Sequence, residues 1–171
     1  TQTMDELAEF ISNKSIYGGY LYVDIGSNRR GGRIVMSNHG ALVARKESSL
    51  TGLVSQIVPQ NSTEEDTAQR LLDFVTTHMV YNHLEANRRG ETLKRPNEVL
   101  MTGGSDCSGL TILYASLLEQ TGIDYRLVYG DINGEGHINV AVAGNFGSRN
   151  GMRFRLGDKD YTFAEPTTRG F

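Results

Sequence analysis

The apolar residues in the middle of the chain recur at helical spacing. Between positions 107 and 121, four leucines form a wide stripe that Ile112, Tyr114 and Ala115 extend, and such spacing is typical of a buried helix face. The run Gly103-Gly104-Ser105-Asp106 precedes this segment and Gly122 follows it, as in a loop, a helix start and a helix stop. We predict a central helix that lies between a sheet and another helix.

A second helical pattern lies upstream. Ser62 and Glu65 have the spacing of a capping box. The apolar positions that follow at helical spacing are Ala68, Leu71, Leu72, Val75 and Met79. The residues expected to face water are Asp66, Gln69, Arg70 and Asp73. A shorter helix is predicted over residues 4–11. Another is predicted to begin at Pro96, because proline is tolerated in the first turn of a helix, where its missing N–H would have no partner.

Strand-like runs separated by glycine and polar turns flank these helices. In the first part of the chain they cover residues 20–25, 33–36 and 41–44. Beyond Gly122 they cover residues 125–129, 137–143, 152–156 and 161–165. Four strands with tight connections after a helix predict an antiparallel sheet. The predicted fold class is therefore α+β, with the central helix packed on that sheet.

Composition narrows the classes of function. The chain has 171 residues, 38% of them hydrophobic, which suits one packed domain. We expect a single domain over residues 1–171, in which 1–60 form a β-rich N-terminal extension and 61–171 the core with the candidate chemistry. The 17 basic and 20 acidic side chains give a formal charge of -3 without a long run of one sign. Nucleic acid is therefore not an expected partner.

The chain also lacks the pattern of a membrane protein. No window approaches the roughly 18 continuous apolar residues of a membrane span, and the N-terminus lacks the basic and then apolar pattern of a signal peptide. We therefore expect a soluble protein. Because the chain begins at Thr1 rather than at methionine, we expect an excised domain or a mature exported product; the compartment and the oligomeric state stay open.

Cys107 is the only cysteine, which excludes an internal disulfide. It lies where the central helix is predicted to begin, and there the unpaired backbone N–H groups and the helix macrodipole favour a thiolate over a thiol. The alternative is a buried cysteine that acts as a small hydrophobe. The polar Gly-Gly-Ser-Asp context favours an activated nucleophile, since a core cysteine more often lies on the apolar face of a helix.

Two polar residues at strand ends can complete such a nucleophile. His137 opens a predicted strand after a glycine-rich loop, and Glu165 closes a later strand just before Pro166. Taken alone, each residue is better explained as inert: His137 as a strand-edge histidine and Glu165 as a solvated carboxylate. Together they supply a base for the thiol and a group that orients the base. The remaining histidines are interpreted as a turn residue and as surface or capping residues: His39, His78 and His83.

Residues 95–168 resemble the core of the transglutaminase-like superfamily, a papain-like group that includes tissue transglutaminases, peptide N-glycanases and many bacterial cysteine peptidases. The resemblance rests on a glycine-rich approach to Asp-Cys, a helix ending in Gly-Ile, a histidine that opens a strand, and an acidic residue before Pro-Thr. These motifs are Gly104-Ser105-Asp106-Cys107, Leu113-Tyr114-Ala115-Ser116-Leu117-Leu118, Gly122-Ile123, His137-Ile138-Asn139-Val140 and Glu165-Pro166-Thr167. The resemblance implies a papain-like α+β core with Cys107, His137 and Glu165 as the catalytic residues.

The implied chemistry is acyl transfer through a thioester. His137 takes the thiol proton, Cys107 attacks a peptide or carboxamide carbonyl, and Glu165 fixes the imidazole. Attack of water on the thioester gives hydrolysis, and attack of an amine gives transamidation. By analogy with small bacterial members of the group, we expect a cysteine peptidase or amidase with a protein or peptide substrate. The alternatives are a protein transglutaminase, a catalytically inactive binding or assembly module, and a small-molecule acyltransferase.

Two features depart from the family pattern. The acidic residue is usually aspartate and here is Glu165, and the chain has no tryptophan that could donate to an oxyanion. The backbone N–H of Cys107 can provide one donor. The candidates for a second donor are Tyr81, Asn82 and Asn97.

No cofactor is expected, because the implied chemistry requires neither a metal nor an organic group. Calcium is a weaker alternative that rests on acidic loop residues. These are Asp131, Glu135, Asp158 and Asp160, and their spacing is not that of an EF-hand.

Overall fold

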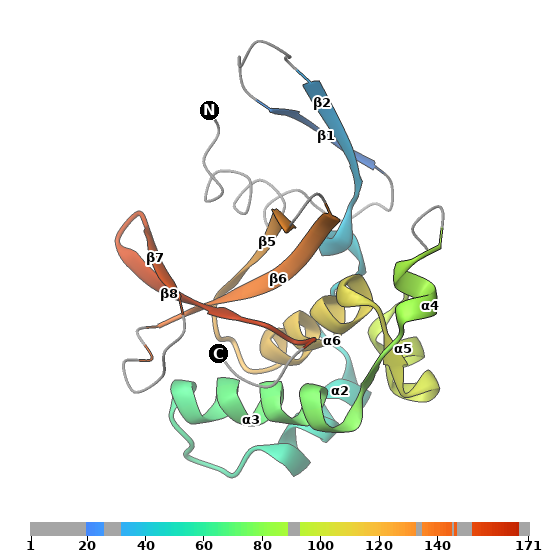
Figure 1. Ribbon diagram of the computed structural model, residues 1–171. Coiled ribbons are helices and arrows are strands. Elements are labelled where there is room, and N and C mark those ends of the chain that lie inside the picture. Colours follow the sequence, from blue (N-terminus) through green and yellow to red (C-terminus); the bar gives the residue numbers. More distant parts are fainter. Residues whose placement is uncertain are drawn as a thin grey trace.

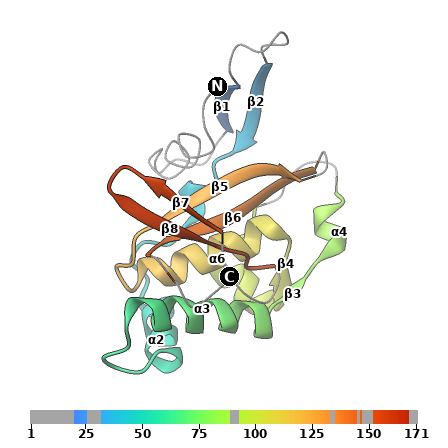
Figure 2. The same ribbon diagram turned by 60° about the vertical axis from the view of Figure 1, so that its left-hand side comes forward.

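Helix α6 (Cys107–Glu119) runs through the centre of the molecule, between a sheet and helix α3 (Figures 1 and 2). The structure, a computed structural model, describes residues 20–25, 32–88, 93–132, 135–144, 146 and 152–167. Every residue from 108 to 118 is buried. The prediction of a central helix is confirmed, and its wide apolar surface is buried because layers cover it on two sides.

The sheet consists of four antiparallel strands in the order β5-β6-β8-β7. They are β5 (Tyr125–Ile132), β6 (Glu135–Ala143), β7 (Arg153–Leu156) and β8 (Lys159–Ala164). Alternation along β6 sorts its side chains onto two faces. Ile138, Val140 and Val142 join the main core with α6, whereas Ala141 joins a smaller cluster around Tyr161. The predicted α+β class and the antiparallel sheet are confirmed.

Helix α3 (Glu64–His78) covers the other side of α6. Four of the five residues predicted from helical spacing are fully buried: Ala68, Leu71, Leu72 and Val75. The fifth, Met79, is the C-cap and is partly buried against the same core. Tyr114 of α6 donates a hydrogen bond to the carbonyl of Ala68 (3.0 Å) and ties the two helices together. Gln69, expected to face water, is buried instead and donates to Asp73 (2.6 Å).

The start of α3 differs from the prediction by one residue. Thr63 is the N-cap, and its hydroxyl accepts a hydrogen bond from the N–H of Asp66 (3.1 Å). Ser62 instead donates to the carbonyl of Pro59 (2.8 Å) in the preceding turn. Because that turn already engages the Ser62 hydroxyl, the capping role passes to the next residue.

Residues 38–57 form a layer against α6 that the hydrophobic pattern does not predict. The 3-10 helix η1 (His39–Leu42) replaces the strand predicted at 41–44, so that prediction is wrong. Helix α2 (Ser48–Ile57) follows, and its Leu50 is fully buried. Serine, threonine, glycine and valine make up much of α2 and favour helix only weakly. Packing against the core therefore stabilises α2 more than its local preference does.

Side chains at the C-terminal end of α6 form hydrogen bonds with the backbone of this layer, as a neighbouring strand would. The N–H of Ala44 donates to Oγ of Ser116 (3.0 Å), and Nε2 of Gln120 donates to the carbonyl of Ala44 (2.9 Å). Buried backbone groups need such partners. Since α6 supplies them, the run at 41–44 does not need to join a β-ladder.

The hairpin of β1 (Tyr20–Ile25) and β2 (Gly32–Ser37) is antiparallel, with Tyr20 opposite Ser37. Both predicted strands are confirmed. The hairpin projects from the layers around α6 in both views (Figures 1 and 2). The helix predicted at 4–11 lies outside the described residues, and the division of the chain at residue 60 stays a prediction.

Four short elements surround the start of α6. The strands β3 (Val80–Tyr81) and β4 (Gly104–Ser105) form a parallel pair, and the helices are α4 (His83–Ala86) and α5 (Pro96–Thr102). Helix α5 begins at Pro96, as predicted. The β3–β4 pair places the segment after α3 beside the loop that precedes Cys107. None of the helices in the described part of the chain is long and apolar enough to cross a membrane.

Candidate active site

Cys107 is the first residue of α6 and is half-buried. Asp106 is the N-cap, and its Oδ1 accepts a hydrogen bond from the N–H of Gly109 (3.1 Å). Gly103 has a φ of 75°, a conformation that favours glycine. A Cβ atom at Gly104 would lie 2.2 Å from the carbonyl oxygen of Val80. The two glycines are therefore required for the chain to turn and pass close to β3 before the helix begins.

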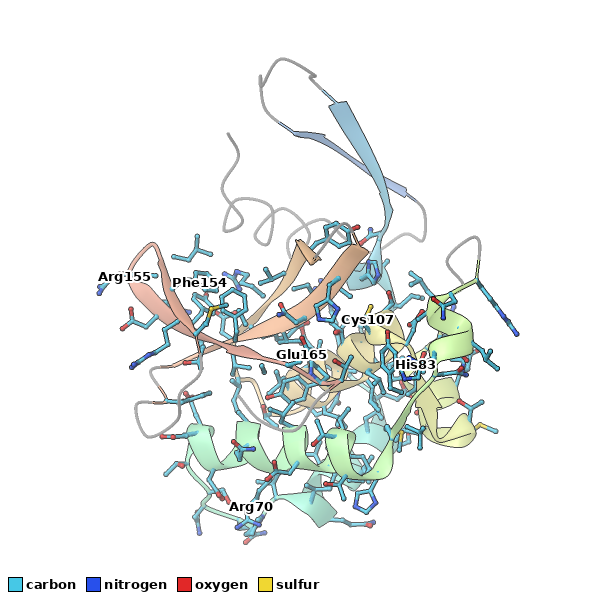
Figure 3. All side chains as sticks on the ribbon, viewed as in Figure 1. Arg70, His83, Cys107, Phe154, Arg155 and Glu165 are labelled. Carbon is cyan, nitrogen blue, oxygen red and sulfur yellow. The ribbon has the colours of Figure 1, made fainter. Side chains whose placement is uncertain are left out.

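His137 and Glu165 meet at the start of this helix. Nε2 of His137 lies 2.6 Å from Oε2 of Glu165, and the imidazole also forms a hydrogen bond with Cys107. Since Nε2 faces the carboxylate, Nδ1 is the nitrogen left for the thiol. Figure 3 shows Cys107 on α6 and Glu165 just beyond the end of β8. The structure brings the three predicted site residues together, and their catalytic role stays a prediction.

Glu165 is held on both of its oxygens. Oε1 accepts hydrogen bonds from the N–H of Thr167 (3.2 Å) and from the Thr167 hydroxyl (2.7 Å). Burial alone would raise the pKa of Glu165, but the hydrogen bonds from His137 and Thr167 outweigh burial and lower the pKa. The carboxylate thus stays ionised and keeps a fixed orientation towards the imidazole.

The surroundings of His137 favour its charged form. The hydrogen bond with Cys107 is the largest effect and the hydrogen bond with Glu165 the next, and together they raise the pKa of His137 to about 10 against the opposing effect of burial. The side chains of His137 and Glu165 keep 20% and 27% of their surfaces exposed. An imidazolium beside a thiol favours the thiolate, which is the form that attacks a carbonyl.

The three candidates for a second oxyanion donor have different surroundings in the structure. The side chain of Asn82 caps α4 and donates to Glu85 (3.0 Å). Asn97 donates to Glu47, the residue that precedes α2. Tyr81 pairs with Ser105 in the β3–β4 ladder, two residues before Cys107. Tyr81 is therefore the candidate whose backbone pairs with the segment directly before Cys107.

The other histidines differ from one another. His78 is exposed and packs on Phe74 (5.0 Å between ring centroids). His83 is exposed and packs edge-on against Tyr81 (4.7 Å). Both agree with the interpretation of surface residues.

His39 is not the simple turn residue that its Asn38 and Gly40 neighbours predict. Its side chain is only 2% exposed, and Nε2 lies 2.9 Å from Oγ of Ser108, the residue after Cys107. The hydrogen bond joins η1 to the first turn of α6. No local pattern indicates this contact, because the two residues are far apart in sequence.

Metal binding has no candidate group among the residues that the structure describes. Within the described ranges, no three His, Cys, Asp or Glu side chains are grouped so as to hold a metal ion. Asp158 and Asp160 lie in or beside the β7–β8 turn, and Asp160 pairs with Arg155.

A cysteine at a helix start, joined to a histidine and a carboxylate at the ends of adjacent strands, is an arrangement of cysteine-dependent acyl transfer. A family model described as the transglutaminase-like superfamily matches residues 51–159, and the chain belongs to this superfamily. The matched region includes Cys107 and His137 and ends before Glu165. No curated protein matches the chain, and no solved structure does so.

Proposed function

We propose that the protein is a thiol-dependent acyl-transfer enzyme that hydrolyses peptide or glutamine-type amide bonds through a thioester on Cys107. The observation that carries this proposal is the continuous path of hydrogen bonds from Cys107 through His137 to Glu165. A histidine that served only the fold would not need a thiol on one ring nitrogen and an oriented carboxylate on the other. Family membership supports cysteine-dependent acyl transfer or peptide hydrolysis as the kind of function.

In this mechanism His137 moves protons through Nδ1. It accepts the proton of the Cys107 thiol, and the thiolate attacks the carbonyl carbon of the substrate amide. The imidazolium then returns the proton to the nitrogen of the leaving amine as the C–N bond breaks and the thioester remains. Glu165 accepts the Nε2–H, which fixes the tautomer and the direction of the ring throughout.

The tetrahedral intermediate carries an oxyanion that needs donors in place. The backbone N–H of Cys107 has no partner within the helix, because it belongs to the first turn. We assign the second donor to the hydroxyl of Tyr81, because the β3–β4 ladder places Tyr81 opposite Ser105, two residues before Cys107. The phenol takes the role of the tryptophan that the chain lacks.

Hydrolysis is proposed ahead of transamidation by analogy with the small peptidases that the chain resembles. The side chains of His137 and Glu165 are partly exposed, which is compatible with the entry of a water molecule as the second nucleophile. Water adds to the thioester carbonyl and gives its proton to Nδ1, and the Cys107 thiolate leaves. The products are a carboxylic acid and the regenerated thiol and imidazole pair.

The first test is the pH dependence of Cys107 alkylation by iodoacetamide, followed by mass spectrometry. In the wild type, the rate should stay high well below about 8.5, the pKa of a free thiol. The rate at low pH should fall in His137→Ala, and to a smaller extent in Glu165→Gln. Alkylation that follows the ordinary thiol profile in all three proteins would overturn the proposal and leave the inactive binding module as the better account.

The second test distinguishes the acceptors. Glutamine-containing peptides are incubated with the protein in the presence and absence of a primary amine, and the products are identified by mass. Cleaved or deamidated peptide is expected in both samples. A product that appears only with the amine and carries it would replace hydrolysis by transamidation.

A further inference from the structure

The loop that precedes Cys107 is bound by the carboxylate of Glu85, a residue outside the helices predicted from the sequence. Oε2 of Glu85, in α4, accepts a hydrogen bond from Oγ of Ser105 (3.0 Å). The same carboxylate accepts the backbone N–H of Asp106. Glu85 therefore binds both residues that directly precede the nucleophile. Its own orientation is fixed by Asn82, which caps α4 and donates to Oε1.

Lys94 contacts both Glu85 and the loop that precedes Cys107. Its ammonium forms an ion pair with Oε1 of Glu85. It also donates to the carbonyl of Gly104 (3.3 Å) and reaches the hydroxyl of Thr102 (3.4 Å). Each of the three residues before Cys107 is thus bound by one member of the pair.

Both members of the pair are largely withdrawn from water. The side chains of Lys94 and Glu85 are 21% and 18% exposed, and a charge at such a position needs a partner and hydrogen bonds to offset its lost hydration. Burial raises the pKa of Glu85, but the hydrogen bonds from Lys94 and Ser105 outweigh it and lower the pKa. The pair is therefore a largely buried ion pair that contacts the three residues before Cys107.

Ser105 transmits the position of this pair to α6. A Cβ atom at Gly109 would lie 2.0 Å from Oγ of Ser105, so the serine packs directly against the first turn of the helix. The N–H of Asn82 also donates to the Ser105 carbonyl (2.9 Å). A shift of Glu85 would thus move the backbone on which Cys107 and its oxyanion-binding N–H are mounted.

We propose that Glu85 and Lys94 are positioning residues for Cys107, which hold the nucleophile loop and balance the charge beside the thiolate. This inference rests on the proposed function, because it has meaning only if Cys107 reacts as a thiolate. The negative charge of Glu85 opposes a thiolate nearby, and the positive charge of Lys94 cancels that effect. Two residues that only braced the loop would have no such opposite effects.

Other charged or titratable groups also lie near Cys107. They are the same in the wild type and in the Glu85 and Lys94 variants. His137 and Glu165 approach from the sheet, Asp106 precedes the cysteine, and His39 approaches through Ser108. Replacing Glu85 or Lys94 leaves the charges of these groups in place. Shifts of opposite sign in the two variants therefore report the charge of the pair, because a movement of the backbone alone would not give opposite signs.

The experiment measures the rate of Cys107 alkylation by iodoacetamide against pH in Glu85→Gln, Lys94→Met and the double variant. Lys94→Met leaves the carboxylate without its partner, so the pH midpoint should rise and the rate below the midpoint fall by roughly threefold to tenfold. Glu85→Gln leaves the ammonium, so the midpoint should fall and the rate there rise by a similar factor, as expected for one charge close to a protein surface. The double variant should return towards the wild-type midpoint.

Two controls separate charge from folding. Lys94→Arg keeps the charge and should keep the wild-type midpoint. Arg70→Met removes an ion pair with Asp66 on α3, far from Cys107 in Figure 3, and should leave the profile unchanged. Circular dichroism shows whether each variant is folded.

Shifts of both single variants in the same direction, or no shift in either, would overturn the inference while leaving the proposed function in place. A wild-type cysteine that reacts like a free thiol would overturn both. Opposite shifts that cancel in the double variant support the inference, because a purely structural brace does not produce them.

Discussion

The hydroxyl of Thr111 donates a hydrogen bond to the backbone carbonyl of Ile138 across 3.1 Å. Thr111 lies one turn after Cys107, and Ile138 directly follows His137. The bond therefore joins the element that carries the thiol to the strand that carries the imidazole. It is buried, so water does not replace it when it is lost.

We expect Thr111→Val to loosen the alignment of Cys107 with His137. The variant removes the donor with little change in shape, which costs about 1 kcal/mol of stability and lowers the rate of Cys107 alkylation at low pH. Thr111→Ser keeps the hydroxyl and serves as the matched control. Equal low-pH rates in the valine and serine variants would show that this bond does not align the pair.

The raised pKa of His137 makes stability depend on pH on the alkaline side. Because its pKa rises from 6.5 to about 10 on folding, the stabilisation is present in full below pH 6.5 and is lost as the pH rises through 10. Urea unfolding of the wild type and of His137→Gln should show a difference in free energy that shrinks across this window. A difference that stays constant would contradict the raised pKa.

Glu165 makes the folding stability depend on pH on the acid side, where its stabilising effect is lost as the pH falls. Its pKa is lowered from 4.5, so its stabilisation is present above pH 4.5 and is lost as the pH falls below that value. Urea unfolding of Glu165→Gln should therefore approach the stability of the wild type as the solution becomes acidic. A gap that widens towards low pH would be inconsistent with an ionised Glu165 in the folded protein.

Tyr81→Phe should separate acyl transfer from thiol reactivity. Loss of an oxyanion donor lowers the acylation rate by about 100-fold to 1,000-fold in known cases, whereas alkylation by iodoacetamide forms no oxyanion. We expect slower release of nitrophenol from p-nitrophenyl acetate and an unchanged alkylation rate. Asn97→Ala is the control, and a larger loss in that variant than in Tyr81→Phe would exclude Tyr81 as the donor.

Leu50→Ala tests whether the layer before residue 60 belongs to the core. Leu50 is fully buried, and removal of a buried leucine side chain costs about 2–5 kcal/mol. Leu84→Ala is the matched control, because Leu84 is 78% exposed and should change the free energy of unfolding by less than about 0.5 kcal/mol. Similar small effects in both variants would place α2 outside the cooperative unit and support a division at residue 60.

The sequence by itself determined the elements that carry the candidate site. The apolar stripe and the glycine punctuation around α6 are local signals, so they predict both the helix and the position of Cys107 at its start. The glycine-rich loop before His137 and the proline after Glu165 likewise predict that these two residues lie at strand ends. These features follow from backbone periodicity, which a short stretch of residues expresses without knowledge of its surroundings.

Only the tertiary structure decided which polar residues surround the nucleophile. The sequence predicts His39 as a turn residue and places Glu85 in no predicted helix or strand, yet His39 contacts Ser108 and Glu85 accepts a hydrogen bond from Ser105. The same holds for the segment at 41–44, whose backbone bonds to α6 in place of a strand. Each of these contacts joins residues that are far apart in sequence, and their hydrogen bonds depend on where the chain returns after folding rather than on any local pattern.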